Sequence, residues 1–332
     1  MILDEAFLRK LEQLSFNVRH VRPGQSAGER RSTKHGTSVE FADYRDYARG
    51  DDLRRVDWNI YARLERPFVK LFEEEEDLAV HLLLDGSASM DWGGEETRGQ
   101  GDGETRRQGD QATERPSDQL TTRPRDHDNK WGYARRLTAA LGYVALVSGD
   151  RLTAATLQSP LSPLLSPLSS LPSSFGPARG RGHTPRLFDW LTTLKAGGTT
   201  DLNATLRAYA LAAGRPGLAI LISDLFSPAG YIDGLTALAA RGHEVAVLHT
   251  LAPDEIEPPL AGDLRLVDVE TGEPQEVTID PHTRARYRRR LAAWRDEIQA
   301  ACRARGAHYL PVETDTPLDR LVLYQLRTAR LL

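Results

Sequence analysis

A short apolar run that ends in a carboxylate is the feature that most limits what this sequence can fold into. Residues 78–84 are apolar apart from His81, and Asp85, Gly86 and Ser87 follow at once. Continuous apolar runs of this length, bounded by turn residues, are typical of strands buried on both faces of a parallel sheet. In open α/β sheets, ligands bind at the carboxyl ends of such strands. The run therefore predicts a parallel α/β sheet with a polar site where this strand ends.

The polar segment after this strand has the composition of a metal-binding loop. Asp85, Ser87 and Ser89 are spaced two residues apart, and Gly86 allows the backbone to turn sharply between them. Three oxygen-bearing side chains on one tight loop can converge on a hard cation such as Mg²⁺. Taken alone, this pattern is weakly specific, because an ordinary polar turn has the same composition.

Two later segments offer further oxygen ligands. A Gly-Gly turn at 197–198 is followed by Thr199 and Thr200 and then by a helical pattern. The apolar run at 218–222 reads as a second core strand, and Asp224 lies just after it. Because the carboxyl ends of parallel strands meet at one edge of a sheet, we expect Asp224 and one of the two threonines to join the first loop.

Together these residues resemble the metal-ion-dependent adhesion site of von Willebrand factor A domains. The matching residues are Asp85, Ser87, Ser89, Thr200 and Asp224. Farther upstream, residues 40–58, 62–63 and 69–75 are similar to the signature of the domain of unknown function fifty-eight family. Members of that family are bacterial and archaeal von Willebrand A-like proteins, often encoded beside MoxR-type AAA+ ATPases.

The resemblance implies a function as well as a fold. In the family such a site holds Mg²⁺, with Mn²⁺ and Ca²⁺ as alternatives, and a carboxylate from a partner protein completes the coordination. The family spacing favours Thr200 over Thr199 as the threonine ligand. The chain is therefore expected to be a metal-dependent protein-binding module and not an enzyme. The implied partner is a MoxR-type ATPase or its client, with this chain acting as an adaptor in protein complex assembly or remodelling.

Two other functions remain open at this point. A strand-terminal aspartate beside Mg²⁺ also begins the haloacid-dehalogenase phosphatase site, but that site needs a second aspartate where this chain has Ser87. No P-loop, serine-hydrolase elbow or zinc-spaced Cys/His set is present. The other alternative is a scaffold with a vestigial metal site, although all five ligand types are retained. Turnover of a phosphate ester that is lost in Asp85→Ala would single out the phosphatase.

The order of predicted elements indicates a doubly wound, mostly parallel sheet that is von Willebrand A-like and Rossmann-like. We expect an N-terminal helix and accessory lobe over 1–77, followed by a von Willebrand A-like domain over 78–332. A stretch at about 91–130 is rich in polar residues and has almost no aliphatic ones, which predicts a disordered insertion. Residues 159–177 read as a Pro- and Ser-rich loop, and residues at about 262–280 as a β-hairpin excursion.

The accessory lobe mixes aromatic side chains with paired opposite charges. Tyr44, Tyr47 and Trp58 are expected to pack its interior, with Arg–Asp pairs holding the irregular backbone. The alternative is a partner-docking surface, because Trp, Tyr and Arg dominate interface hot spots.

Charge and composition indicate the kind of partner and the cellular compartment to expect. The formal net charge of the 332 residues is −4, which gives no electrostatic reason to expect nucleic-acid binding. Cys302 is the one cysteine, so no internal disulfide forms. No apolar run reaches the roughly 18 residues that a membrane span needs, and the N-terminus lacks the pattern of a secretory signal. These features predict a cytoplasmic protein and leave the oligomeric state open.

Overall fold

The chain divides into two compact units. One unit comprises residues 1–20 and 78–332, and the other comprises residues 21–77. The computed structural model describes residues 2–17, 40–48, 56–64, 66–73, 78–92, 129–158, 173–267 and 274–332. Residues 93–128, which make up most of the predicted insertion, lie outside the described residues, so its disorder stays a prediction.

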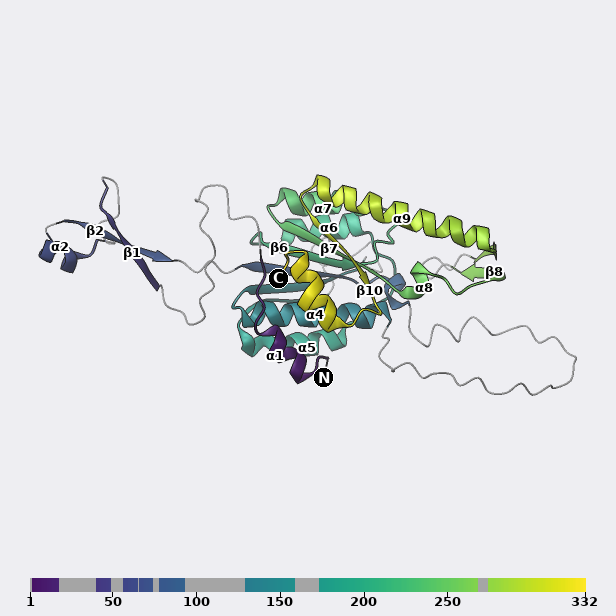
Figure 1. Ribbon diagram of the computed structural model, residues 1–332, viewed down its shortest axis with the longest axis horizontal. Coiled ribbons are helices and arrows are strands. Elements are labelled where there is room, and N and C mark those ends of the chain that lie inside the picture. The colour runs from purple at the N-terminus through teal and green to yellow at the C-terminus, as the bar shows by residue number, and fades with distance from the viewer. Residues whose placement is uncertain are drawn as a thin grey trace, which may run out of the picture. The chain divides into compact units, whose positions relative to one another are not determined.

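A single central sheet organises the larger unit (Figure 1). Among the described residues, six strands lie in the order β10-β7-β6-β3-β4-β5. Every neighbouring pair is parallel except β4 with β5, which is antiparallel. The strands are β3 (Ala79–Asp85), β4 (Arg151–Leu157), β5 (Ser174–Arg179), β6 (Leu218–Ser223), β7 (Glu244–Leu251) and β10 (His308–Glu313). The predicted mixed α/β fold with a mostly parallel sheet is confirmed.

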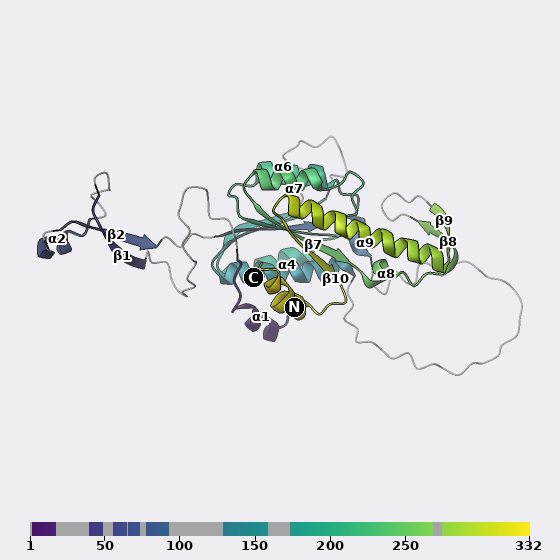
Figure 2. The ribbon, with the colours of Figure 1, turned by 45° about the horizontal axis from the view of Figure 1, so that its top comes forward.

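Helices pack on both faces of this sheet (Figures 1 and 2). The face that carries α4 also carries α1, α5 and the C-terminal helical segment, and the opposite face carries α6, α7 and α9. Successive side chains of a strand point to opposite faces, so Leu82 and Leu84 join the first core and Leu83 joins the second. The helices are α1 (Glu5–Leu11), α4 (Lys130–Val147), α5 (Thr184–Thr193), α6 (Leu202–Ala212), α7 (Ile232–Ala240), α9 (Pro281–Ala304), α10 (Leu318–Arg320), η4 (Leu321–Gln325) and α11 (Leu326–Thr328).

The strand order reverses beside β3. From β3 the chain moves outward to β4 and β5, then returns to the other side of β3 to form β6 and continues to β7 and β10. The carboxyl ends of β3 and β6 therefore flank a topological switch point, the place where open α/β sheets bind ligands.

Helix α1 belongs to the larger unit and not to the accessory lobe with which the sequence analysis grouped it. Phe7 and Leu11 of α1, and Leu3 just before the helix, are buried in the core that includes α4. The Tyr143 hydroxyl of α4 donates to Glu12 at 2.8 Å. These apolar positions could be read from the sequence, but the surface that they cover could not.

Strand β5 falls at the end of the segment that the sequence analysis expected to be a loop. Ser174–Arg179 pairs antiparallel with β4 at the edge of the sheet. An edge strand tolerates Pro177, which has no N–H to donate. The predicted hairpin is present, formed by β8 (Gly262–Val267) and β9 (Pro274–Ile279). The short helix α8 (Pro253–Ile256) comes shortly before this hairpin.

The smaller unit contains a two-stranded antiparallel sheet and one helix among its described residues. Strand β1 (Glu40–Asp46) pairs with β2 (Phe68–Glu73), and α2 (Trp58–Leu64) lies between them in the chain. Asp57 caps α2 by accepting the N–H of Asn59 at 2.9 Å. Trp58 is 58% exposed, so it does not pack a lobe interior as predicted. Tyr47 is half-buried, and the side chain of Tyr44 lies outside the described residues.

In the described part of the chain, no helix is both long enough and apolar enough to cross a bilayer.

A buried histidine in β3 gives the fold a predictable pH dependence. The Nε2 of His81 lies 3.0 Å from the Arg215 carbonyl, and its Nδ1 lies 2.8 Å from the Tyr209 hydroxyl. A carbonyl only accepts, so Nε2 carries a proton and donates it to the Arg215 carbonyl. Burial, helped by the nearby His243, lowers the pKa of His81 from 6.5 to about 4.

The unfolded chain binds a proton at His81 more readily than the folded chain does. The contribution of neutral His81 to stability is therefore fully present above the unfolded pKa of 6.5 and is lost as the pH falls toward about 4. Urea unfolding at about pH 7.5 and about pH 5 should differ by about 2 kcal/mol from His81 alone. His81→Gln should show a shallower dependence between these two pH values. An equal dependence in the two proteins would contradict the assignment.

Candidate metal centre

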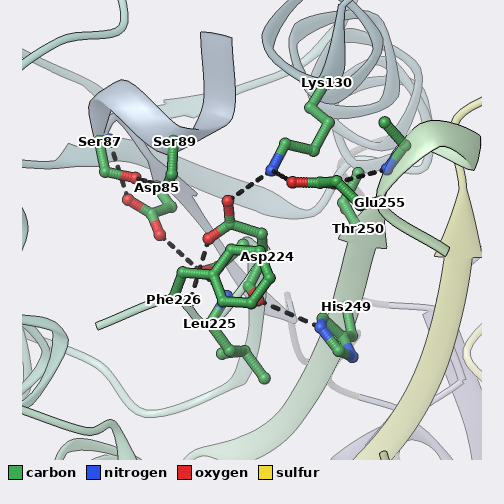
Figure 3. A network of polar contacts seen from close by, with 12 residues as sticks. Asp85, Ser87, Ser89, Lys130, Asp224, Leu225, Phe226, His249, Thr250 and Glu255 are labelled. Atoms are coloured by element: carbon green, nitrogen blue, oxygen red, sulfur yellow. Dashed lines mark hydrogen bonds and ion pairs between the residues drawn. The ribbon is translucent and has the colours of Figure 1, made fainter. Parts of the chain in front are cut away.

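Four of the predicted site residues, Asp85, Ser87, Ser89 and Asp224, lie close together at the switch point of the sheet (Figure 3). Asp85 is the last residue of β3, and Asp224 directly follows β6, the neighbouring strand. The two carboxylates are 2% and 0% exposed, respectively. Two acidic residues at adjacent strand ends, both out of contact with solvent, form the centre of the site.

The loop after β3 holds its side chains through its own hydrogen bonds. Asp85 Oδ1 accepts the Ser87 N–H at 3.0 Å, and Asp85 Oδ2 accepts the Ser223 hydroxyl at 2.5 Å. The hydroxyls of Ser87 and Ser89 are 2.9 Å apart, and Figure 3 shows both side chains beside Asp85. The structure therefore brings together the first three predicted ligands on one turn.

Gly86 leaves room for the side chain of Gln158. The Gln158 amide donates to the Gly86 carbonyl at 2.8 Å and to the Lys195 carbonyl at 2.9 Å. A Cβ on Gly86 would lie 2.6 Å from Nε2 of Gln158. The absence of a side chain thus allows one amide to join the metal-binding loop to the segment that leads into the Gly-Gly turn.

The Gly-Gly turn lies against the same loop. The N–H of Gly197 donates to the Gly86 carbonyl at 2.8 Å, and the N–H of Ala88 donates to the Gly198 carbonyl at 2.9 Å. The Thr200 hydroxyl donates to the Leu157 carbonyl at 3.2 Å, and the Leu157 carbonyl also accepts the N–H of Gly86. Thr200 is thereby held next to the loop that follows β3.

The two threonines of this turn differ in burial. Thr200 is 4% exposed, whereas Thr199 lies on the surface. Thr200 therefore faces the interior beside the loop of Asp85, and its preference over Thr199 as a ligand stays a prediction.

A lysine occupies the other side of Asp224. The ammonium of Lys130 lies 2.7 Å from Asp224 Oδ2 and 2.6 Å from Glu255 Oε1 (Figure 3). The second oxygen of Glu255 accepts the N–H of Ala252 at 2.8 Å. Asp224 Oδ1 accepts the N–H of Phe226 at 3.1 Å, so both of its oxygens have donors.

Burial and neighbouring charges shift the pKa values of these groups. Burial raises the pKa of Asp85 to about 6, and the negative charge of Asp224 adds to the shift against hydrogen bonds from Ser223 and Ser87. Burial would lower the pKa of Lys130, but the carboxylates of Asp224 and Glu255 outweigh it and the pKa is raised. Burial also raises the pKa of Glu255, more than the charge of Lys130 lowers it.

The donor set suits a hard divalent cation. With all groups ionised, three carboxylates face one ammonium, and the two excess negative charges match the charge of Mg²⁺. The described residues contain no group of three or more His, Cys, Asp and Glu that could hold a metal ion, so hydroxyl oxygens would have to contribute. Ser87, Ser89 and Thr200 provide them at the same strand ends, and the residues present therefore fit the ion.

The partners of these residues were not predicted from the sequence. Lys130 was placed at the end of the predicted insertion, but it is the first residue of α4 and is fully buried. The signal was Asn129, whose side chain caps the helix by accepting the N–H of Gly132 at 2.8 Å. Glu255 and Ser223 carried no comparable signal.

Comparison with known proteins identifies the family. Residues 43–101 and 115–297 match the family described as "Protein of unknown function DUF58". The chain belongs to the DUF58 family. The uncharacterized protein Rv1480 of Mycobacterium tuberculosis is 28% identical over 316 residues, which is 94% of this chain and 86% of the relative. The uncharacterized protein MAV169 of Mycobacterium avium is 37% identical over 115 residues, 35% of this chain and 68% of the relative.

Two solved structures are distantly similar. The conserved hypothetical protein BatB from Bacteroides thetaiotaomicron has a TM-score of 0.37 at 12% identity, covering 76% of this chain and 98% of that one. An aerotolerance-related membrane protein from Bacteroides fragilis has a TM-score of 0.36 at 11% identity with the same coverage.

Proposed function

We propose that this DUF58 chain is a metal-dependent protein-binding module with a von Willebrand A-like, Rossmann-like domain. The observation that carries the proposal is the meeting of Asp85, Ser87 and Ser89 with Asp224 at the switch point of the sheet, with Thr200 on the adjoining turn. Hydroxyl and carboxylate oxygens are the ligands that Mg²⁺ prefers, with Mn²⁺ and Ca²⁺ as alternatives.

Each residue has a distinct task in this proposal. Ser87, Ser89 and Thr200 would offer neutral oxygens to the ion, and Asp85 and Asp224 would offer charge. Ser223 holds Asp85 in place through its hydroxyl. A site with few anionic ligands leaves the ion electrophilic, and the bound ion would supply an open position for a carboxylate of the partner protein.

The surroundings of the site also suit a protein partner. Trp92 directly follows the short turn η2 (Ala88–Asp91) and is 42% exposed, and Phe226, two residues after Asp224, is 40% exposed. Exposed aromatic side chains are enriched at the centres of interfaces.

We further propose that the partner is a MoxR-type AAA+ ATPase or its client, with this chain as a cytoplasmic adaptor in complex assembly or remodelling. Family resemblance supports this choice of partner, and the net charge of −4 agrees with a partner other than nucleic acid.

Metal titration tests the site directly. Isothermal titration of Mg²⁺ and of Mn²⁺ at about pH 8, where Asp85 is ionised, should give saturable binding to the wild type. Asp85→Asn keeps the shape of the side chain but removes its charge, and should weaken binding by at least about 100-fold. Asp189→Asn makes the same change at an exposed carboxylate of α5 and should bind as the wild type does.

The titrations are repeated with acetate in the calorimeter cell, where it replaces the carboxylate of the partner protein as the last ligand of the ion. If the wild type binds neither ion with or without acetate, the proposal fails and the vestigial scaffold is favoured. Hydrolysis of a phosphate ester that depends on Asp85 would instead favour the phosphatase.

A further inference from the structure

We propose that Lys130 is a built-in cation of this site that competes with divalent metal for Asp224 and so sets the metal affinity. The inference rests on the metal site proposed above and assigns its regulation to a residue outside the ligand set. It starts from the position of the Lys130 ammonium, which contacts the Asp224 carboxylate at 2.7 Å.

The ion pair of Lys130 with Asp224 differs from the surface pairs of this chain. Both side chains are 0% exposed, whereas those of the Arg207–Asp233 pair are 54% and 62% exposed. Burying an ammonium carries a large desolvation cost, and a buried pair is often no more stabilising than well-packed apolar groups of the same volume. A charge kept at that cost beside a candidate metal ligand indicates a role in the electrostatics of the site.

Aromatic packing keeps the ammonium where it is. The ammonium of Lys130 lies 5.4 Å from the ring centroid of Phe226, which stacks on Trp294 with ring centroids 5.2 Å apart and planes 7° apart. The backbone of Lys130 is also fixed, because its N–H donates to the Trp92 carbonyl at 2.9 Å. The ammonium therefore stays next to Asp224 when a metal ion arrives, and the two cations repel each other across a water-poor site.

Glu255 acts in the opposite direction. It accepts from the ammonium at 2.6 Å and is only 14% exposed, so it offsets much of the Lys130 charge. Removing the lysine charge should thus strengthen metal binding, and removing the glutamate charge should weaken it. Damage to the packing of the site would weaken binding in both cases.

Three variants distinguish an effect of charge on metal affinity from an effect of damaged packing. Lys130→Met, Glu255→Gln and the double variant are compared with the wild type by isothermal titration of Mg²⁺ and Mn²⁺ at about pH 8 and low salt. We expect Lys130→Met to bind about tenfold more tightly or better. We expect Glu255→Gln to bind more weakly, and the double variant, whose net charge equals that of the wild type, to fall between the two.

Each outcome bears on one proposal or the other. Equal or weaker binding in Lys130→Met, or weakest binding in the double variant, overturns the role of Lys130 and leaves the metal site standing. Binding by Lys130→Met alone, lost again when Asp85→Asn is added, supports the role of Lys130 and overturns metal-dependent function in the wild type. Absence of binding in all four proteins overturns both. If Lys130→Met does not fold, Glu255→Gln and the double variant decide, because tighter binding in the double variant than in Glu255→Gln is expected from charge and not from damage.

Discussion

Lys130→Met is expected to lower the free energy of unfolding of the metal-free protein by about 3–5 kcal/mol. The substitution keeps most of the side-chain volume but leaves the carboxylates of Asp224 and Glu255 without their shared cation. Asp224 is fully buried, and the nearby Asp85 adds a second negative charge. Among the described contacts, the cation that neutralises Asp224 is Lys130. The loss therefore comes from unpaired buried charge and not from a cavity.

Urea unfolding followed by circular dichroism, in the presence of chelator, measures this loss. Arg9→Met provides the control, because the Arg9–Glu5 pair has side chains 74% and 78% exposed and should contribute less than about 1 kcal/mol. A loss in Lys130→Met as small as that in the control would mean that the two carboxylates are protonated or rearranged at little cost.

Added metal should partly reverse the effect of Lys130→Met. A ligand that binds only the folded state stabilises it in proportion to the logarithm of its concentration over the dissociation constant. If Mn²⁺ binds Lys130→Met more tightly than the wild type, the same concentration of Mn²⁺ raises the stability of the variant by more. Urea unfolding and metal titration would then give two independent measurements of how the Lys130 charge affects the site.

The parts of the fold that the sequence predicted are those encoded by local pattern. The apolar run before Asp85 identified β3 as a buried strand, and the matching run before Asp224 identified β6. Parallel pairing then placed both aspartates at one edge of the sheet without any knowledge of side-chain contacts. The choice of Thr200 over Thr199, by contrast, came from the family resemblance and not from this rule.

The partners of Asp224 could not be predicted in this way. Lys130 reaches Asp224 across 94 residues of sequence and Glu255 across 125, and no periodicity connects positions so far apart. The predicted insertion ended at about residue 130, so the first residue of α4 was assigned to it. What could be read from local chemistry was the cap at Asn129, which indicates a helix but not the charge that its first residue meets.

Gly217→Ala is expected to destabilise the protein by about 3 kcal/mol or more. Gly217 directly precedes β6. A Cβ at this position would overlap the carbonyl oxygen of Ala79, at the start of β3, and would lie 2.7 Å from its carbonyl carbon. Neither group can move alone, because the Gly217 carbonyl also accepts the N–H of Glu244 at 2.9 Å and Ala79 lies within the β3–β4 ladder. The strain therefore falls on the pairing of β3 with β6.

The same pairing aligns Asp85 with Asp224, so metal affinity should fall with stability in Gly217→Ala. Gly214→Ala is the matched control, because a Cβ at Gly214 meets no atom within 4 Å and its stability should change by less than about 1 kcal/mol. Urea unfolding and Mn²⁺ titration of both variants give the comparison. If Gly217→Ala loses stability but keeps full metal affinity, the two strand ends are held in place by the Asp85–Ser223 hydrogen bond and the loops, and not by the spacing of β3 and β6.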